Sequence, residues 1–278
     1  MTTRLVAPLQ RAGVVRSRPG LSVLMYHGVN DDPEPETQGY YRLNTPVSLF
    51  QRQMDWLQEN GFRTIGLHEV PAMLLSPSGM EPTNRLVVIT FDDGYKDFLQ
   101  NAWPAMNRHG FTGTVFLPTA YIGNETMLFR RQPCLTWAEV RDLRKEGVFF
   151  GPHTVTHREL NRLSWEDAAE EITRSKQQVE EALGEAIPTF SHPYGFPAAD
   201  RSYVERYCSL LERLQVKASV TTLLGRVRAG ISPLLLPRLP VNGIDALPLF
   251  SAKMRGAYDW LSGPQRIMKR MRLFLGDG

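Results

Sequence analysis

The sequence predicts an α/β fold in which a parallel β-sheet closes into a barrel. Short apolar runs alternate with segments of helical period along the chain, which is the order typical of parallel strands joined by helices. Reactive side chains also lie at the ends of five different strand candidates. A barrel assembles its site from several strand ends, whereas an open sheet draws mainly on one switch point, so the pattern favours a barrel.

Seven short apolar runs are the strand candidates, as expected of strands buried on both faces. They are Ser22–Met25, Leu86–Phe91, Thr114–Leu117, Val148–Phe150, Pro188–Phe190, Ala218–Thr221 and Leu235–Leu239. The first is followed by Tyr-His-Gly, the second by Asp-Asp-Gly, the fourth by Gly-Pro-His-Thr-Val-Thr-His and the fifth by Ser-His-Pro-Tyr-Gly, and the last contains an Arg. A site is expected where these clusters meet.

Five helices are predicted between the strands, each with a recognisable first or last residue. They run from Ser48 to Gly61, from Tyr95 to Arg108, from Thr136 to Gly147, from Ser164 to Gly184 and from Asp200 to Leu214. Thr136 and Glu139 form a capping box at the start of the third helix. Pro104 predicts a kink in the second.

Composition and charge narrow the class of protein. With 278 residues, of which 42% are hydrophobic and 22% charged, the chain can bury a globular core. Residues 21–250 carry 22 basic and 27 acidic side chains, so this body lacks the basic surface of a nucleic-acid binder, and we expect no nucleic-acid partner. Two cysteines do not make a disulfide framework.

Three segments are expected along the chain: a basic N-terminal extension (1–20), a barrel domain (21–250) and a basic amphipathic C-terminal segment (251–278). No run resembles a signal peptide or reaches the roughly 20 apolar residues of a membrane span, so the chain as given is predicted to be cytoplasmic. Residues 264–275 place apolar side chains on one helical face and basic ones on the others. This pattern predicts peripheral contact with the inner face of a membrane, the alternative being a helix docked on the barrel.

Two of the clusters carry metal-binding chemistry. In the segment HTVTH, His153 and His157 are spaced so that a helical turn would put both imidazoles on one face, within reach of one ion. Alone this spacing also occurs in core and surface histidines. Asp92 and Asp93 follow an apolar run, and adjacent carboxylates repel unless a cation or hydrogen-bond donors compensate them; a simple turn is the alternative.

Combined, the two clusters indicate a catalytic metal site. Two imidazoles and one carboxylate around Zn²⁺ leave positions open for water and substrate. The second carboxylate could then act as a general base toward that water. Hydrolysis of an amide also needs an acid, because the departing amine has to be protonated.

Three motifs resemble a known family. TFDDG at 90–94, HTVTH at 153–157 and SHPYG at 191–195 are similar, in order and spacing as well, to the first three motifs of the polysaccharide deacetylases, the NodB-homology domain of carbohydrate esterase family 4. The resemblance covers roughly residues 22 to 241. It implies a distorted (β/α)7 barrel and metal-dependent removal of an N- or O-acetyl group from a sugar.

The resemblance also implies roles for single residues. Asp92 would be the base, and Asp93, His153 and His157 would bind Zn²⁺ or another divalent transition metal such as Co²⁺ or Ni²⁺. The backbone amide of Tyr194 would help to hold the oxyanion. The turn His192-Pro193-Tyr194 is the candidate for substrate contact, and the 118–135 segment is a candidate wall of the site.

The sequence departs from the family pattern at two positions. The third motif usually carries an Arg where this chain has Ser191, and no His follows His192, although the general-acid His usually lies in a late motif. In a closed barrel the first and last strands are neighbours, so His27 on the first strand end can supply the acid. This placement resembles the biofilm-polysaccharide deacetylase branch, in which that His is N-terminal. Arg238 is the candidate for orienting Asp92.

Each of these assignments has an alternative. His27 could be a core histidine, and His192 competes with it for the role of acid or simply packs. Arg238 could form a surface ion pair. The predicted function is a metal-dependent hydrolase that removes N-acetyl groups from amino sugars of a polysaccharide or its lipid-linked precursor. One alternative function is a deformylase of a lipid-linked amino sugar, which shares these motifs. An alternative from another class of protein is a catalytically degenerate barrel that binds carbohydrate.

Overall fold

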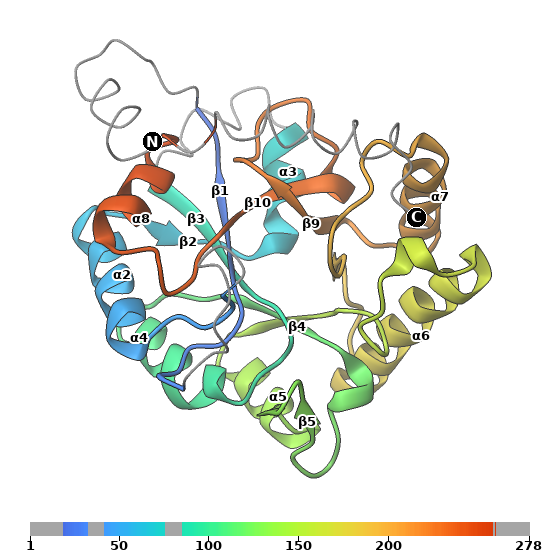
Figure 1. Cartoon of the computed structure of the whole chain (residues 1–278), viewed down its shortest axis with the longest axis horizontal. Coiled ribbons are helices and arrows are strands. Elements are labelled where there is room, and N and C mark those ends of the chain that lie inside the picture. The colour runs from blue at the N-terminus through green and yellow to red at the C-terminus, as the bar shows by residue number, and fades with distance from the viewer. Residues whose placement is uncertain (1–18, 33–41, 76–84, 258, 260–278) are drawn as a thin grey trace.

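Seven parallel strands form the wall of a barrel, in the order β7-β4-β3-β1-β10-β9-β8 (Figure 1). The computed structural model describes residues 19–32, 42–75, 85–257 and 259. The strands are β1 (Ser22–Tyr26), β3 (Leu86–Phe91), β4 (Thr114–Leu117), β7 (Phe149–Pro152), β8 (Thr189–Ser191), β9 (Ala218–Leu224) and β10 (Leu236–Pro240). Each of the seven predicted runs forms one of these strands, with ends that shift by a few residues.

The first and last strands are neighbours, as the sequence predicted. β1 pairs in parallel with β3 on one side and with β10 on the other. The seam of the barrel lies instead between β7 and β8, where no ladder joins the described residues. His153 bridges this seam, because its Nδ1 lies 2.8 Å from the carbonyl oxygen of Ser191. The barrel is therefore nearly closed and distorted, in agreement with the expected (β/α)7 class.

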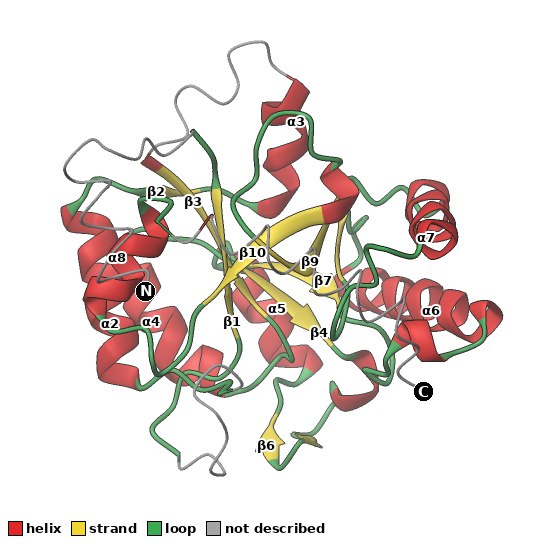
Figure 2. Ribbon diagram, turned by 45° about the horizontal axis from the view of Figure 1, so that its top comes forward, coloured by secondary structure: helices red, strands yellow, loops and turns green. Residues whose placement is uncertain are grey.

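Helices surround the strands, and Figure 2 shows them outside the central sheet. They are α2 (Val47–Glu59), α3 (Val70–Leu75), α4 (Trp103–Asn107), α5 (Trp137–Lys145), α6 (Trp165–Leu183), α7 (Arg201–Arg213) and α8 (Leu247–Met254). The predicted capping box is present at α5, where Thr136 Oγ1 accepts a bond from the backbone N–H of Glu139. Ser164 caps α6 in the same manner, and Gly184 ends that helix with φ 69°.

Three local predictions need correction. The second predicted helix is a π-helical turn (Phe98–Ala102) followed by α4, because Pro104 lacks the N–H that would continue an α-helical ladder from the preceding turn. Helix α2 begins at Val47 with no side-chain cap, so Ser48 is not its cap. The sequence also gave no sign of the short strands β2 (Arg63–Thr64), β5 (Leu128–Phe129) and β6 (Gln132–Pro133).

The membrane prediction rests on residues that lie outside the described part of the chain. Both the basic segment before residue 19 and the amphipathic stretch 264–275 fall there. Within the described residues, no helix combines the length and the apolar character needed to cross a membrane. Peripheral contact remains a prediction, which liposome flotation with and without residues 264–278 would test.

Candidate active site

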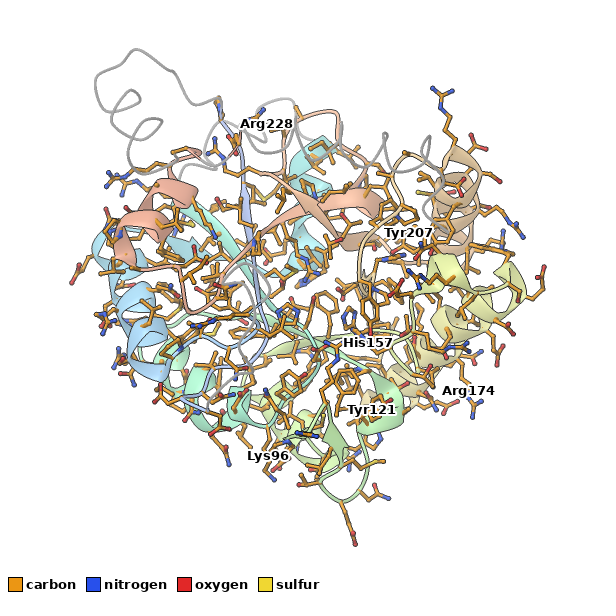
Figure 3. The ribbon with its side chains drawn as sticks, in the orientation of Figure 1. Lys96, Tyr121, His157, Arg174, Tyr207 and Arg228 are labelled. Atoms are coloured by element: carbon orange, nitrogen blue, oxygen red, sulfur yellow. The ribbon has the colours of Figure 1, made fainter. Side chains whose placement is uncertain are left out.

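The predicted polar clusters meet at the carboxyl end of the barrel. His27 follows β1, and Asp92 and Asp93 follow β3. His153 and His157 follow β7. Ser191 is the last residue of β8 and His192 to Tyr194 come after it, while Arg238 lies within β10. Figure 3 shows the labelled His157 near the centre of the view, inside the ring of helices. Segments as distant as residues 27 and 238 thus contribute to one site.

Three side chains are placed as ligands of one ion. Asp93 Oδ1 lies 3.3 Å from Nε2 of His157 and 3.8 Å from Nε2 of His153. All three ligand atoms lie within 4.8 Å of one another, and all three residues are buried. Ligands about 2.1 Å from a tetrahedral ion lie about 3.4 Å apart, so the observed spacing suits one such ion.

The unpaired atoms of this cluster also fit a cation. Asp93 Oδ1 is buried and has no hydrogen-bond partner among the described residues, while Oδ2 accepts a bond of 3.1 Å from the hydroxyl of Tyr95. The carbonyl of Ser191 accepts a hydrogen bond from His153 Nδ1–H, which leaves the Nε2 lone pair directed at the cluster. A buried carboxylate oxygen facing two imidazole nitrogens is costly unless a positive charge lies between them.

The two histidines do not lie on a helical turn, which corrects the geometry expected from their spacing. Residues 153–157 form a loop in which Thr154 and His157 have positive φ values of 66° and 54°. The hydroxyl of Thr154 accepts a bond of 3.0 Å from the backbone N–H of His157. The ring centroids of His153 and His157 are nevertheless 4.7 Å apart. A strained loop, and not helical periodicity, brings the imidazoles together.

Glu171 of α6 holds this loop, a role that no sequence pattern indicated. Its carboxylate accepts bonds from the backbone N–H groups of Val155 (2.9 Å) and Thr156 (2.8 Å) and from the Thr156 hydroxyl (2.6 Å). The bonded residues lie between the two histidines. In the sequence Glu171 is one of several acidic residues on a charged helix, so nothing distinguished it from a solvated side chain.

Asp92 is held by a guanidinium at both of its oxygens. Arg238 donates to Oδ1 at 2.8 Å and to Oδ2 at 2.7 Å, and its Nε donates to the Thr221 carbonyl at 3.0 Å. Arg238 is 1% exposed, so the alternative of a surface ion pair is wrong. Its Nη2 also lies 3.3 Å from the Ser191 hydroxyl. A guanidinium therefore reaches Asp92 from β10, beside the position where the family usually has an Arg.

The titration of the site follows from burial and from these partners. Burial alone would raise the pKa of Asp92, but Arg238, with smaller contributions from His153 and His27, holds that pKa well below its usual range. Burial raises the pKa of Asp93, and the neighbouring Asp92 adds to this. Burial lowers the pKa of His157 to about 2, and the positive charge of Arg130 contributes to this. The pKa of His153 is also lowered, chiefly by burial, so both imidazoles are neutral, as metal ligands have to be.

His27 faces the Arg-paired carboxylate. Its Nε2 lies 4.0 Å from Asp92 Oδ2, and its side chain is 17% exposed. The next residues of its loop are anchored, because the Val29 N–H donates to the buried carboxylate of Asp97 at 3.0 Å. A Cβ at Gly28 would lie 2.3 Å from Asn44 Oδ1, so a larger residue there would displace the Asn44 side chain. His27 is therefore fixed at the edge of the site, next to Asp92 and within reach of solvent.

Of the predicted substrate-contacting residues His192, Pro193 and Tyr194, Tyr194 alone is exposed. Tyr194 is 40% exposed, has φ 53°, and its ring centroid lies 4.8 Å from that of His157. His192 is fully buried and its Nε2 lies 2.9 Å from the Tyr203 hydroxyl, within an aromatic cluster with Phe196 and Tyr207. Pro193 is buried too. The burial of His192 and Pro193 indicates that both pack in the interior and do not contact substrate. Tyr194 is the residue of these three that a substrate can reach.

The barrel has seven strands, and its carboxyl end carries a buried Asp-His-His cluster and a second carboxylate that is paired with an arginine. These features together are typical of barrel deacetylases. Residues 79–219 match the sequence profile of the family described as polysaccharide deacetylase, and the chain belongs to this family.

The chain is also similar to proteins that are named as deacetylases. The chain is 28% identical to YxkH of Bacillus subtilis over 238 residues, which cover 86% of this chain and 75% of that protein. It is 26% identical to the poly-β-1,6-N-acetyl-D-glucosamine N-deacetylase of Escherichia coli over 168 residues. The aligned region covers 55% of this chain and 24% of that protein. The fold resembles that of the Streptococcus pyogenes deacetylase PplD, with TM-score 0.71, 24% identity and coverage of 86% and 99%.

Proposed function

We propose that this chain is a divalent-metal-dependent hydrolase that removes N-acetyl groups from amino sugars of a polysaccharide or of its lipid-linked precursor. The observation that carries the proposal is the meeting of Asp93, His153 and His157 beside the separately paired carboxylate of Asp92. The E. coli relative is named for deacetylation of poly-β-1,6-N-acetyl-D-glucosamine, and this supports an N-acetylated glycan as the substrate class.

The donor set fits Zn²⁺, Co²⁺ or Ni²⁺, because imidazole and carboxylate ligands suit these ions. Asp93, His153 and His157 would hold the ion. When bound, it would acidify a water molecule and polarise the acetyl carbonyl. The remaining chemistry is assigned to the side chains and backbone of this chain.

Asp92 is the proposed base. Arg238 keeps the carboxylate ionised at neutral pH and fixes the direction of both oxygens. As the water oxygen attacks the acetyl carbon, Asp92 accepts the proton that the water loses. The low pKa of Asp92 makes it a weak base, and a bound ion would offset this by lowering the pKa of the water.

His27 is the proposed acid, and Tyr194 the proposed oxyanion donor. As the C–N bond breaks, a protonated His27 donates its proton to the amine nitrogen, which yields acetate and a free amino sugar. The Nε2 of His27 lies 4.0 Å from Asp92 Oδ2, so the proposed acid and base face the same reacting centre. The backbone N–H of Tyr194 would donate to the oxygen that gains negative charge during attack.

Acetate release from N-acetylglucosamine oligomers tests this function. The metal-loaded protein is expected to release acetate, to lose this activity on chelation and to regain it when Zn²⁺ or Co²⁺ is returned. The Asp92→Asn variant is expected to lose about 10²- to 10⁴-fold in rate, as for removal of a general base. Asp142→Asn, which changes an exposed carboxylate on α5, is the matched control. A protein that releases no acetate from any acetylated glycan in the presence of metal would contradict the proposal.

A further inference from the structure

Arg130 lies at the tip of the β5–β6 hairpin in an unusual backbone conformation. Arg130 and Arg131 form the two-residue turn, with φ values of 50° and 68°. Turns of this kind favour Asn-Gly, because most side chains are strained at positive φ. Two arginines thus occupy a turn that would be more relaxed with Asn and Gly, and strain of this kind is common at functional sites.

The guanidinium of Arg130 is held over the aromatic wall of the site. Its central carbon lies 5.1 Å from the ring centroid of Phe129 and 5.4 Å from that of Tyr194, and Nη2 donates to the Tyr194 hydroxyl at 2.8 Å. The rings of Phe129 and Tyr194 in turn lie 5.2 Å and 4.8 Å from that of His157. The positive charge is therefore one ring away from a candidate metal ligand.

This guanidinium has no carboxylate partner within 4.0 Å in the described part of the chain. Its side chain is exposed, and the bond to Tyr194 uses only one of its five N–H donors. Stacking on two rings fixes its direction without neutralising its charge. By contrast, the other arginine of the site, Arg238, is buried and fully engaged with Asp92.

We propose that Arg130 binds a negatively charged group, a carboxylate or a phosphate, on the glycan next to the acetylated sugar. The inference rests on the proposed function, since it places the acetylated sugar at the Asp93 cluster. A planar guanidinium binds either anion through two parallel hydrogen bonds. Because the rings already hold Arg130 in place, little side-chain entropy is lost on binding. The anion could come from a uronic acid in a polymer or from the phosphate of a lipid-linked sugar.

Equilibrium binding tests the inference without requiring turnover. Metal-loaded Asp92→Asn protein is titrated by calorimetry with a neutral N-acetylglucosamine tetramer and with a hyaluronan tetrasaccharide, and separately with N-acetylglucosamine and its 1-phosphate. We expect at least one anionic probe to bind about tenfold more tightly than its neutral counterpart, as for one charged hydrogen-bond pair. The probe that shows the preference identifies carboxylate or phosphate as the source.

Variants at the hairpin tip decide which residue is responsible. Arg130→Gln is expected to abolish the preference, Arg130→Lys to restore part of it, and the matched control Arg131→Gln to keep it. The same ratios are measured as kcat/KM for acetate release in protein that retains Asp92, in case Asp92→Asn does not fold. No charge preference in the parent protein, or an equal loss for neutral and anionic probes in Arg130→Gln, would overturn the inference. Absence of acetate release with a retained binding preference would contradict only the proposed function.

Discussion

Asp92 and Asp93 are neighbours in the sequence and are equally buried, yet their surroundings differ. Both oxygens of Asp92 are bonded by Arg238, whereas one oxygen of Asp93 has no hydrogen-bond partner among the described residues. Their pKa values shift in opposite directions, downward for Asp92 and upward for Asp93. The fold thus pairs one carboxylate with an internal arginine and leaves an oxygen of the other available to the proposed metal ion, so two identical residues can perform two different tasks.

Replacing Arg238 by Gln would leave Asp92 without its arginine partner and so make it more like Asp93. We expect this variant to show the largest change, a loss of unfolding free energy. An uncompensated buried carboxylate would cost about 3–5 kcal/mol of unfolding free energy. The measurement is urea denaturation of metal-free protein at pH 7.5. Arg144→Gln, which removes an exposed ion pair with Glu185, is the matched control and should cost less than about 1 kcal/mol.

The same variant makes a signed prediction about pH. In the parent protein the stabilisation from Asp92 is present above its unfolded pKa of about 4 and is lost as pH falls through the depressed folded value. Without Arg238, burial would raise the folded pKa above the unfolded one, so the ionised form would destabilise the protein at neutral pH. The stability gap between parent and variant should therefore narrow from pH 7.5 to pH 4.5. A gap that stays constant would contradict the pairing.

His27 is proposed to act with Asp92 and not with the metal ligands, so its replacement should affect catalysis and not metal binding. His27→Gln should lower kcat about 10²- to 10⁴-fold and remove the alkaline limb of the pH–rate profile, with little change in metal affinity. The control is His109→Gln, because His109 is also 17% exposed but pairs with Asp55 away from the site. An unchanged pH profile would exclude His27 as the acid.

Glu171 supports the metal ligands that lie beside Asp93, and its replacement should have the smallest effect. Glu171→Gln keeps the shape of the side chain but weakens three bonds that hold the loop between His153 and His157. We expect metal affinity to fall about tenfold, as for other outer partners of metal ligands. Competition with a chromophoric chelator measures this, and Glu170→Gln on the same helix, which is exposed, is the control. Equal affinities for both variants would contradict the positioning role.

The strands and the motif residues could be predicted because they depend on local patterns. Continuous apolar runs gave the strands, and charged or imidazole side chains at their ends gave the site. The loop geometry could not be predicted, since Thr154 has a positive φ and the next two backbone N–H groups bond to Glu171 of α6, neither of which the sequence pattern indicates. The hairpin turn of Arg130 and Arg131 was missed for a similar reason, because it lacks the Asn-Gly that such turns prefer.

Metal binding by Asp92→Asn and Asp93→Asn, measured side by side, shows which of the two carboxylates is the metal ligand. Equilibrium dialysis against Zn²⁺, with metal content determined by mass spectrometry, should give about one ion per chain for the parent protein and for Asp92→Asn, and almost none for Asp93→Asn. Circular dichroism confirms that each variant is folded. An Asp93→Asn protein that still binds one ion with parental affinity would contradict the division of labour between the two carboxylates.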